Sequence, residues 1–382
     1  MSIVIIGTGL AGYNTARELR KHDTQTRLIL VSADSGRSYS KPMLSTGYRK
    51  QQTPGDLVQG TPEAMAEQLD ARIITGTPVE AITPHAATVT LAGGEVLAYD
   101  SLVLAAGADP IAPRLDGDAA DAVFQVNDLD QYERFRAAAD DAHRVLIMGG
   151  GLVGCEFAND LREAGCEVDL VFPESAPLPR LIPQRPAEAL HAALENLGVR
   201  VHTGVTLEAV DAGQGGLVGR LSDGRELAAD AILAAIGLQP RTGLARAAGL
   251  AVHHGIRVDP WLTTSDPAIF ALGDCAEVSG YVLPYVLPLT NAARALGPTL
   301  AGQRTAVKYP VMPVTVKTSC CQVVAWPPEE GTPGEWHFDG DGQDLRGEFR
   351  DAEGTLHGFA LTGKRIRERL ELTREMPPLL GD

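Results

Sequence analysis

Residues 3–12 read IVIIGTGLAG, and residues 146–154 repeat the pattern as LIMGGGLVG. In each copy an apolar run typical of a buried parallel strand leads into a glycine-rich turn and then into a stretch with helical spacing. A second strand-like segment follows each predicted helix, at residues 26–31 and 167–172. One glycine turn alone is weak information, but the complete order of strand, turn, helix and strand is specific. Two copies predict two dinucleotide-binding units.

The glycines of these turns have separate physical roles. Gly7 permits the tight turn, Gly9 lets a pyrophosphate approach the backbone, and Gly12 lets helix and strand pack closely. The start of the helix offers unpaired N–H groups to phosphates. Asp34 follows Gly12 by roughly 20 positions, where an acid can hold ribose hydroxyls. The predicted nucleotide-binding residues are Gly7, Thr8, Gly9, Leu10, Ala11, Gly12 and Asp34 in the first unit, and Gly149, Gly151 and Gly154 in the second.

Charge and composition exclude several classes of protein. A formal net charge of −16 argues against nucleic-acid binding, which needs a basic face. No apolar run approaches the roughly 18 residues that span a bilayer. The chain starts directly with a strand pattern, which leaves no room for a signal peptide, so we expect a cytoplasmic protein. The five cysteines have no zinc-ligand spacing, so no metal site is predicted, and the vicinal Cys320 and Cys321 are expected to be free thiols.

Three further stretches resemble the glutathione-reductase-like family of flavoproteins, which has two dinucleotide domains. They are YDSLVLAAGA at 99–108, AILAAIGLQPRT at 231–242 and TTSDPAIFALGDCA at 263–276. The resemblance covers residues 3 to about 290. It implies bound FAD, a pyridine nucleotide as substrate, and contacts to the cofactors from Ala106, Gly107 and Gly237. By the same resemblance, Asp274 bonds the ribityl chain of FAD.

Within that family, YSKPMLS at 39–45 is similar to the Tyr-x-Arg-Pro-x-Leu-Ser segment of the ferredoxin and rubredoxin reductases. Lys41 takes the place of the arginine beside the FAD pyrophosphate, as a point charge without a bidentate fork. The likeness also implies that Val79 presents its backbone to the adenine and that the helix beginning near Val286 aims N–H groups at the flavin. Lys317, in MPVTVKT, is the matching candidate from the C-terminal part of the chain. The alternative for Lys317 is an exposed strand lysine.

The order of the motifs implies interleaved domains in an α/β fold. We expect a discontinuous FAD-binding domain at 1–112 and 242–313 with an NAD-binding domain inserted at 113–241, both Rossmann-like. Residues 314–382 combine short strands with a final helix-like stretch, KRIRERLELTREM at 364–376, and so indicate a small C-terminal α+β domain.

The segment KPMLSTGYRK carries Ser45 and Thr46 where disulfide reductases of the family place a redox cysteine. With no thiol relay, electrons must leave directly from the flavin, which suits an iron protein as acceptor. Relatives often have lysine in place of Thr46, paired with a glutamate that corresponds to Glu156. Glu156 is therefore expected to bond the nicotinamide amide, or to pair with another cation such as Lys50. It would also be stable for dipole reasons alone in the first turn of a helix.

The stretch after the second strand of the second unit decides between NADH and NADPH. Residues 172–180 contain no basic residue until Arg180, and Glu174 would repel a 2′-phosphate and accept a ribose hydroxyl. The usual acidic position of relatives corresponds to Phe172. NADH is the predicted substrate.

The resemblance implies an NADH-dependent flavoenzyme that takes a hydride at the flavin N5 and passes single electrons to rubredoxin, supplying an alkane hydroxylase. The alternatives are a ferredoxin reductase of a dioxygenase or cytochrome P450 system, an NADH oxidase or peroxidase, and a flavin-binding redox sensor. Rubredoxins are acidic, so Lys364, Arg365 and Arg367 are candidate docking residues, although interleaved glutamates equally predict an ordinary salt-bridged helix. Absence of the cysteine relay is compatible with a monomer.

Overall fold

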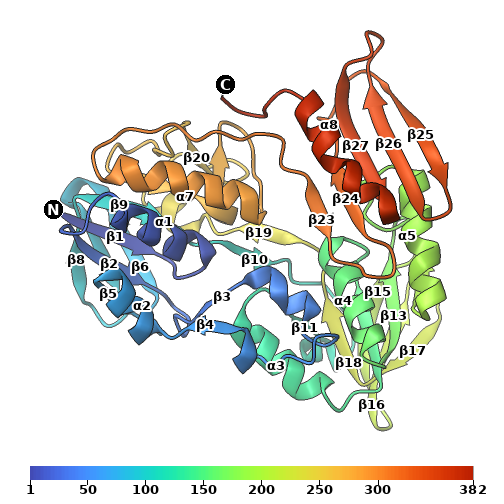
Figure 1. Ribbon diagram of the computed structural model, residues 1–382. Helices are drawn as coiled ribbons and strands as arrows, with labels where there is room; N and C mark the ends of the chain where they lie inside the picture. The colour runs from blue at the N-terminus through green and yellow to red at the C-terminus, as the bar shows by residue number, and fades with distance from the viewer. Residues whose placement is uncertain (382) are drawn as a thin grey trace.

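The computed structural model describes residues 1–381 and has three units (Figure 1). The first is built on a parallel five-stranded sheet whose order is β21-β9-β1-β2-β5. The apolar run at the N-terminus forms its central strand, which is buried apart from its first residue. The strands are β1 (Ser2–Ile6), β2 (Arg27–Val31), β5 (Ala71–Ile74), β9 (Ser101–Leu104) and β21 (Ile269–Ala271).

Helices α1 (Leu10–Arg20) and α7 (Val286–Leu300) pack against each other beside this sheet (Figure 1). Their approach is close, because a Cβ on Gly297 would lie 2.7 Å from the backbone carbon of Glu18. The smaller elements of the unit are β3 (Ser38–Tyr39), β4 (Val58–Gly60), α2 (Pro62–Leu69), β6 (Val79–Thr83), β7 (Thr88–Leu91), β8 (Val96–Ala98), α6 (Gly243–Ala247), β20 (Ile256–Val258) and β22 (Ala276–Val278).

The second unit repeats this plan with a parallel sheet of order β11-β18-β12-β13-β14. Each glycine turn thus follows the central strand of its own sheet. A three-stranded antiparallel sheet, β15-β16-β17, adds to the unit. Its elements are β11 (Phe124–Gln125), α3 (Leu129–Ala139), β12 (Arg144–Met148), α4 (Leu152–Glu163), β13 (Glu167–Phe172), α5 (Gln184–Leu197), β14 (Arg200–Thr203), β15 (Leu207–Gly213), β16 (Gly216–Leu221), β17 (Glu226–Ala229) and β18 (Ala231–Ala234).

Two short strands connect the first two units. β10 (Ala108–Pro110) pairs antiparallel with β19 (Leu238–Pro240), so the outgoing and returning chain run side by side. Pro240 ends β19. The domain limits given above stay a prediction, since nothing in the strand pairing fixes them to a residue.

The C-terminal unit is an antiparallel sheet of order β23-β24-β27-β26-β25 with one short helix. The helix-like stretch KRIRERLELTREM (364–376) is not one helix: its first part belongs to a 3₁₀ segment, Gly363–Glu368, and only Arg369–Glu375 forms α8, whose Leu372 is buried. Its strands are β23 (Val314–Val316), β24 (Val323–Trp326), β25 (Glu335–Asp341), β26 (Asp344–Arg350) and β27 (Leu356–Thr362).

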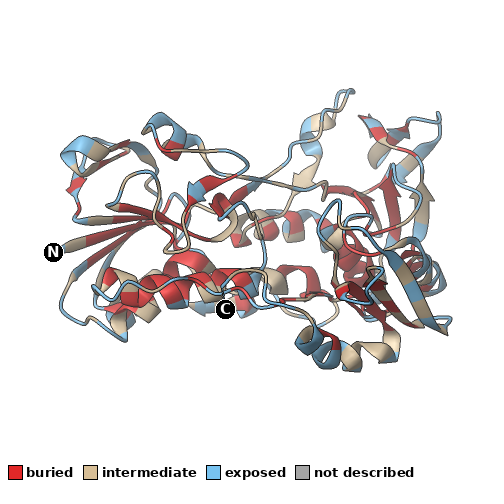
Figure 2. Ribbon diagram, turned by 90° about the horizontal axis from the view of Figure 1, so that it is seen from above, coloured by how far each residue is buried: buried red, intermediate tan, exposed pale blue. Residues whose placement is uncertain are grey.

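The chain end returns to the first unit, where Tyr309 N–H donates to Leu380 O at 2.8 Å. Buried residues concentrate on the central strands and on the helix faces turned toward them (Figure 2). No helix within residues 1–381 has both the length and the apolar character required to cross a bilayer.

Candidate functional site

The first glycine turn has the geometry its sequence predicts. Gly7 has φ +115°, and a Cβ there would lie 2.2 Å from Ala105 O. A Cβ on Gly12 would lie 1.9 Å from Gly7 O, whereas one on Gly9 would meet nothing within 4 Å. Two glycines are thus required by packing, and the third leaves open space beside the backbone. Helix α1 starts at Leu10 and Ala11 without a side-chain cap or an acid in its first turn, so its N–H groups are available to a phosphate.

The second turn repeats this arrangement. Gly149 has φ +115°, a Cβ on Gly154 would lie 1.9 Å from Gly149 O, and Gly151 faces open space at the uncapped start of α4. The middle glycine, Gly150, is also constrained, because a Cβ there would lie 2.5 Å from the ring of Phe172. Both turns therefore fit a dinucleotide pyrophosphate.

Asp34 lies just beyond the carboxyl end of β2 and is only partly used within the protein. Its Oδ1 accepts hydrogen bonds from Ser32 Oγ at 2.6 Å and Gly36 N at 2.8 Å. Oδ2 has no partner among residues 1–381 and remains available to a ribose hydroxyl. Thr77 N donates to Ser32 O at 2.9 Å, which brings the segment leading into Val79 alongside this loop.

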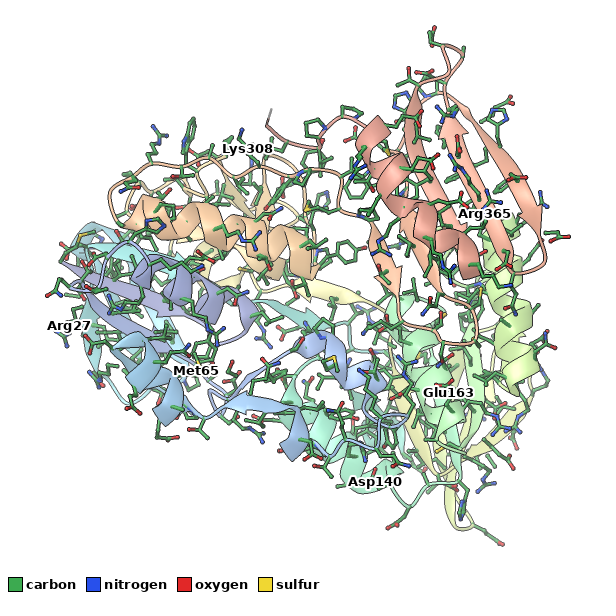
Figure 3. All side chains as sticks on the ribbon, viewed as in Figure 1. Arg27, Met65, Asp140, Glu163, Lys308 and Arg365 are labelled. Atoms are coloured by element: carbon green, nitrogen blue, oxygen red, sulfur yellow. The ribbon has the colours of Figure 1, made fainter. Side chains whose placement is uncertain are left out.

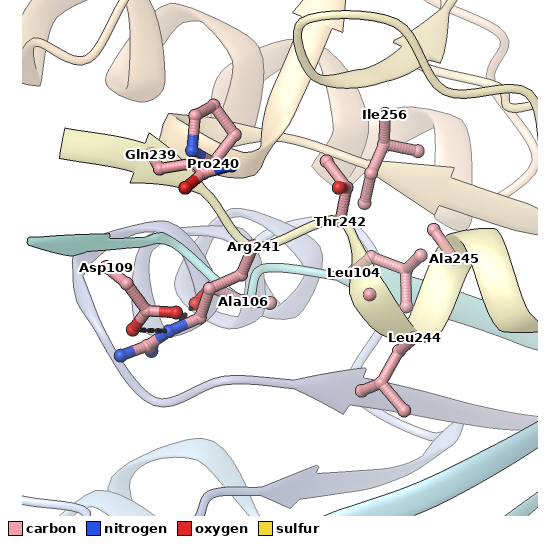
Figure 4. Close-up of a pocket in the computed structure, with 11 residues that line it drawn as sticks. Leu104, Ala106, Asp109, Gln239, Pro240, Arg241, Thr242, Leu244, Ala245 and Ile256 are labelled. Carbon is pink, nitrogen blue, oxygen red and sulfur yellow. Dashed lines mark hydrogen bonds and ion pairs between the residues drawn. The ribbon is translucent and has the colours of Figure 1, made fainter. Parts of the chain in front are cut away.

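Ala106 and Gly107 form a turn at the end of β9, and Arg241 braces it. Arg241 donates from its backbone N to Gly107 O and from Nη1 to Ala106 O, both at 3.0 Å, and its Nε lies 2.6 Å from Asp109 Oδ1. Figure 4 shows Ala106, Asp109 and Arg241 at a pocket of about 410 Å³ that is also lined by Ile256. The motif at 231–242 contains Arg241, but nothing in it predicts that this side chain bonds the carbonyl of Ala106. Gly237, with φ +123°, lies just before β19 on the same return path.

The structure brings two predicted residues from distant segments together. Lys41 Nζ lies 3.3 Å from Asp274 Oδ2, although the two are 233 positions apart in the chain. Near them α7 begins at Val286 with no side-chain cap, and Val286 is 39% exposed. The predicted phosphate, ribityl and flavin-edge residues thus belong to elements that meet at the carboxyl end of one sheet.

Glu156 is buried, with 1% exposure, and its cation partner is Lys317 rather than Lys50. Lys317 Nζ lies 2.8 Å from Glu156 Oε2, and Lys317 N donates to Oε1 at 2.9 Å. Ser45 Oγ donates to Oε2 at 2.5 Å. Lys50 instead is exposed, with its Nζ 4.0 Å from Met43 Sδ. The expectation that Lys50 pairs with Glu156 was wrong, because the ion pair is formed by Lys317, which lies 161 positions away in the sequence.

Thr46, the position of the relatives' lysine, is buried and its hydroxyl donates to Met43 O at 3.1 Å. The proposed contact of Glu156 with the nicotinamide amide, and of Lys317 with the flavin, stay predictions. All three N–H donors of Lys317 are engaged, so its contact with the flavin requires one of these bonds to exchange, whereas Glu156 Oε1 accepts one hydrogen bond and has a further lone pair.

Glu174 is exposed two residues beyond β13, and only its carbonyl is engaged, by Gly204 N at 3.2 Å. Its carboxylate is free to meet a ribose hydroxyl or to repel a phosphate. Phe172 is buried and has no group to offer, which agrees with a shift of the acidic position by two residues.

All five cysteines are free, and none lies on the Lys41–Thr46 segment. Burial raises the pKa of Cys320 to about 12 and those of Cys321 and Cys275 to about 11, and it raises the pKa of Cys155 further. These thiols are protonated at neutral pH and do not form a redox relay with the segment.

The fold has two turns that fit a dinucleotide, and its first unit is assembled from two separate parts of the chain. Together with the absence of cysteine from Lys41–Thr46, these features define the class of two-nucleotide oxidoreductases. The chain belongs to the pyridine nucleotide-disulphide oxidoreductase family, whose model matches residues 1–297. A second model, the rubredoxin binding C-terminal domain, matches residues 306–376. As a member of this family, the chain uses FAD and NADH.

Individual relatives show which members of this family the chain is similar to. The chain is 50% identical to a rubredoxin-NAD(+) reductase of Alcanivorax borkumensis, covering 99% of both chains, and 40% identical to one of Acinetobacter baylyi, covering 99% of this chain and 98% of that one. Among solved structures, the covalent putidaredoxin reductase–putidaredoxin complex matches with a TM-score of 0.89 at 26% identity, over 98% of this chain and 94% of that chain.

Proposed function

We propose that this chain is an NADH:rubredoxin reductase that supplies electrons to an alkane hydroxylase system. The match of the C-terminal unit to a rubredoxin-binding domain carries the choice of acceptor. The names of the two relatives with 50% and 40% identity support the same choice. FAD, when bound, supplies chemistry that accepts a hydride and releases electrons singly.

The protein's own residues do the binding and orienting. The two glycine turns would hold the pyrophosphates, Asp34 and Glu174 would accept hydrogen bonds from ribose hydroxyls, and Lys41 with Asp274 would bind the flavin nucleotide. Buried Ser45 occupies the relay position without a thiol, which favours direct delivery to an iron protein over NADH oxidase or peroxidase chemistry. Cytoplasmic location and a monomeric state stay predictions.

The three candidate docking residues differ in whether their charge is paired with a carboxylate of the protein, and Arg367 is the one that is not paired within the described residues. Arg365 is engaged by Asp339 at 2.9 Å and by Glu368, and Lys364 Nζ lies 3.7 Å from Asp344. Arg367 is exposed and has no carboxylate within ion-pair distance in the described chain. We expect Arg367 to steer the acidic rubredoxin.

The test is anaerobic reduction of the FAD-loaded protein with NADH, followed by turnover with rubredoxin and, separately, with ferredoxin. We expect kcat/KM for rubredoxin to exceed that for ferredoxin at least about tenfold. Equal or higher activity with ferredoxin would make the protein a ferredoxin reductase instead.

Arg367→Glu should lower the second-order rate with rubredoxin and flatten its salt dependence. Arg27→Glu is the matched control, because Arg27 is exposed at the start of β2, far from the C-terminal unit around Arg365 (Figure 3). An equal effect of both variants would remove Arg367 from the docking surface.

A further inference from the structure

Lys317 of the C-terminal unit contacts both of the other units. Lys317 follows β23 of the C-terminal unit, and its ammonium donates to Ser45 Oγ at 2.8 Å and to Pro42 O, both on the Lys41–Thr46 segment of the first unit. Its third contact is Glu156 Oε2 at 2.8 Å, on α4 of the second unit. An ammonium has three N–H donors, so all three are satisfied by protein acceptors.

The chain after Lys317 is anchored along the same helix. Lys317 N donates to Glu156 Oε1 at 2.9 Å, and Cys320 N donates to Asn159 Oδ1 at 3.1 Å. Asn159 Nδ2 also donates to Ser319 Oγ at 2.8 Å. Glu156 and Asn159 are three positions apart and so share one face of α4. The side chains of Glu156 and Asn159 are at most 1% exposed, so the α4 side of this contact is buried.

We propose that Lys317 is a positioning residue, which fixes the rubredoxin-binding unit relative to residues 41–50, here called the flavin-side segment, and so sets the geometry of electron delivery. This inference rests on the proposed function. Glu156 neutralises the charge of Lys317, and the hydroxyl and carbonyl of the flavin-side segment take its other donors. All three N–H donors of the Lys317 ammonium are therefore used in contacts with the other two units. Because displacement by about 1 Å can cost roughly a hundredfold in rate, a loosened C-terminal unit lowers productive transfer to a docked protein.

A different role would have a different signature. If Lys317 acted mainly on the flavin, its removal would change the flavin potential and the NADH half-reaction as much as delivery to rubredoxin. A small acceptor such as ferricyanide needs no docking unit, so it reports on the flavin alone.

The experiment compares Lys317→Met, Lys317→Arg and Ser319→Ala with wild type. Lys50→Met is the matched control, because it removes a neighbouring lysine that joins no units. For Lys317→Met we expect kcat/KM for rubredoxin to fall at least about tenfold further than the rates of NADH half-reaction and ferricyanide reduction. Lys317→Arg keeps the charge and should recover part of the loss, and Ser319→Ala should lower rubredoxin turnover less.

Amide hydrogen exchange on the apoprotein gives a readout independent of turnover. Residues 317–321 should exchange faster in Lys317→Met and in Ser319→Ala than in wild type or Lys50→Met. Three results for Lys317→Met would each overturn the proposal. They are equal losses in rubredoxin turnover, NADH half-reaction and ferricyanide reduction; a shifted flavin potential with unchanged amide exchange; or rubredoxin turnover equal to that of wild type. Failure of the wild-type protein to prefer rubredoxin would instead overturn the proposed function.

Discussion

At the scale of single residues, two of the three glycines of the first turn are constrained by backbone carbonyls and the third is not. Gly12 faces the carbonyl of Gly7, where no Cβ fits, while Gly9 faces open space. Packing therefore requires a glycine at position 12, whereas at position 9 it does not, and the role of Gly9 in admitting the ligand is a prediction. The same division holds for Gly154 and Gly151 in the second turn.

Gly9→Ala should therefore fold, losing about 1 kcal/mol at most at a helix start, but bind FAD at least about tenfold more weakly because the methyl group occupies the phosphate approach. Gly12→Ala should lose more than about 4 kcal/mol and give little folded protein. Thermal unfolding of the apoprotein and FAD titration by fluorescence separate the two. Normal FAD affinity in Gly9→Ala would contradict the assigned role.

Asp169 gives the second unit a pH-dependent contribution to stability. Burial alone would raise the pKa of Asp169, but hydrogen bonds from Arg200 at 2.7 Å and His202 at 2.8 Å lower it from 3.8 to about 2. A folded pKa below the unfolded one means that the stabilisation is complete above about pH 4 and is lost as the pH falls toward 2. Arg200 is half exposed, which reduces the expected contribution to about 1–2 kcal/mol.

Asp169→Asn should lower the urea midpoint of unfolding at pH 7, and its difference from wild type should shrink between about pH 4 and pH 3. A difference that stays constant over this range would show that the effect is not electrostatic.

At the scale of elements, α4 connects more than its own unit. Its N-terminus carries the second glycine turn, and one face holds the chain after Lys317. Asp160 on the same helix accepts the N–H groups of Tyr48 and Arg49, each at 3.0 Å, and is 1% exposed. The helix that begins at the second glycine turn thus also fixes the backbone of the stretch that follows the Lys41–Thr46 segment.

Asp160→Ala leaves two buried N–H donors without an acceptor and should cost about 2–4 kcal/mol. Glu163→Gln, a partly exposed site on the same helix, should cost less than about 1 kcal/mol. Thermal midpoints of the apoproteins, with hydrogen exchange at residues 47–50, compare them. Equal midpoints would show that the flavin-side segment is held elsewhere.

At the scale of the whole molecule, none of the five free cysteines lies on the Lys41–Thr46 segment, so the proposed route passes electrons from the flavin to rubredoxin without a thiol. Iodoacetamide near pH 7.5 should leave NADH–rubredoxin turnover unchanged, since the thiolate is the reactive form and burial raises the pKa of the cysteines. Mass spectrometry measures alkylation in parallel with activity. Loss of turnover in proportion to alkylation of one cysteine would contradict direct delivery.

The sequence by itself determined the two dinucleotide turns, the strands before them, the family and its cofactors, and the absence of a relay cysteine. Glycine spacing and apolar runs are local signals, since the turn they specify depends on residues a few positions apart. Prediction of a long C-terminal helix over 364–376 was less successful, because helical spacing continued through residues that form a 3₁₀ segment.

Only the tertiary structure decided that Lys317 pairs with Glu156, that Arg241 braces the turn after β9, and that Asp160 holds the flavin-side segment. Each partner lies more than 100 positions away and on another unit or at a crossing between units. A charged side chain carries no local mark of its distant partner. Its pairing follows from how the units pack, because a buried charge is stable only where packing supplies the opposite charge or a hydrogen-bond partner.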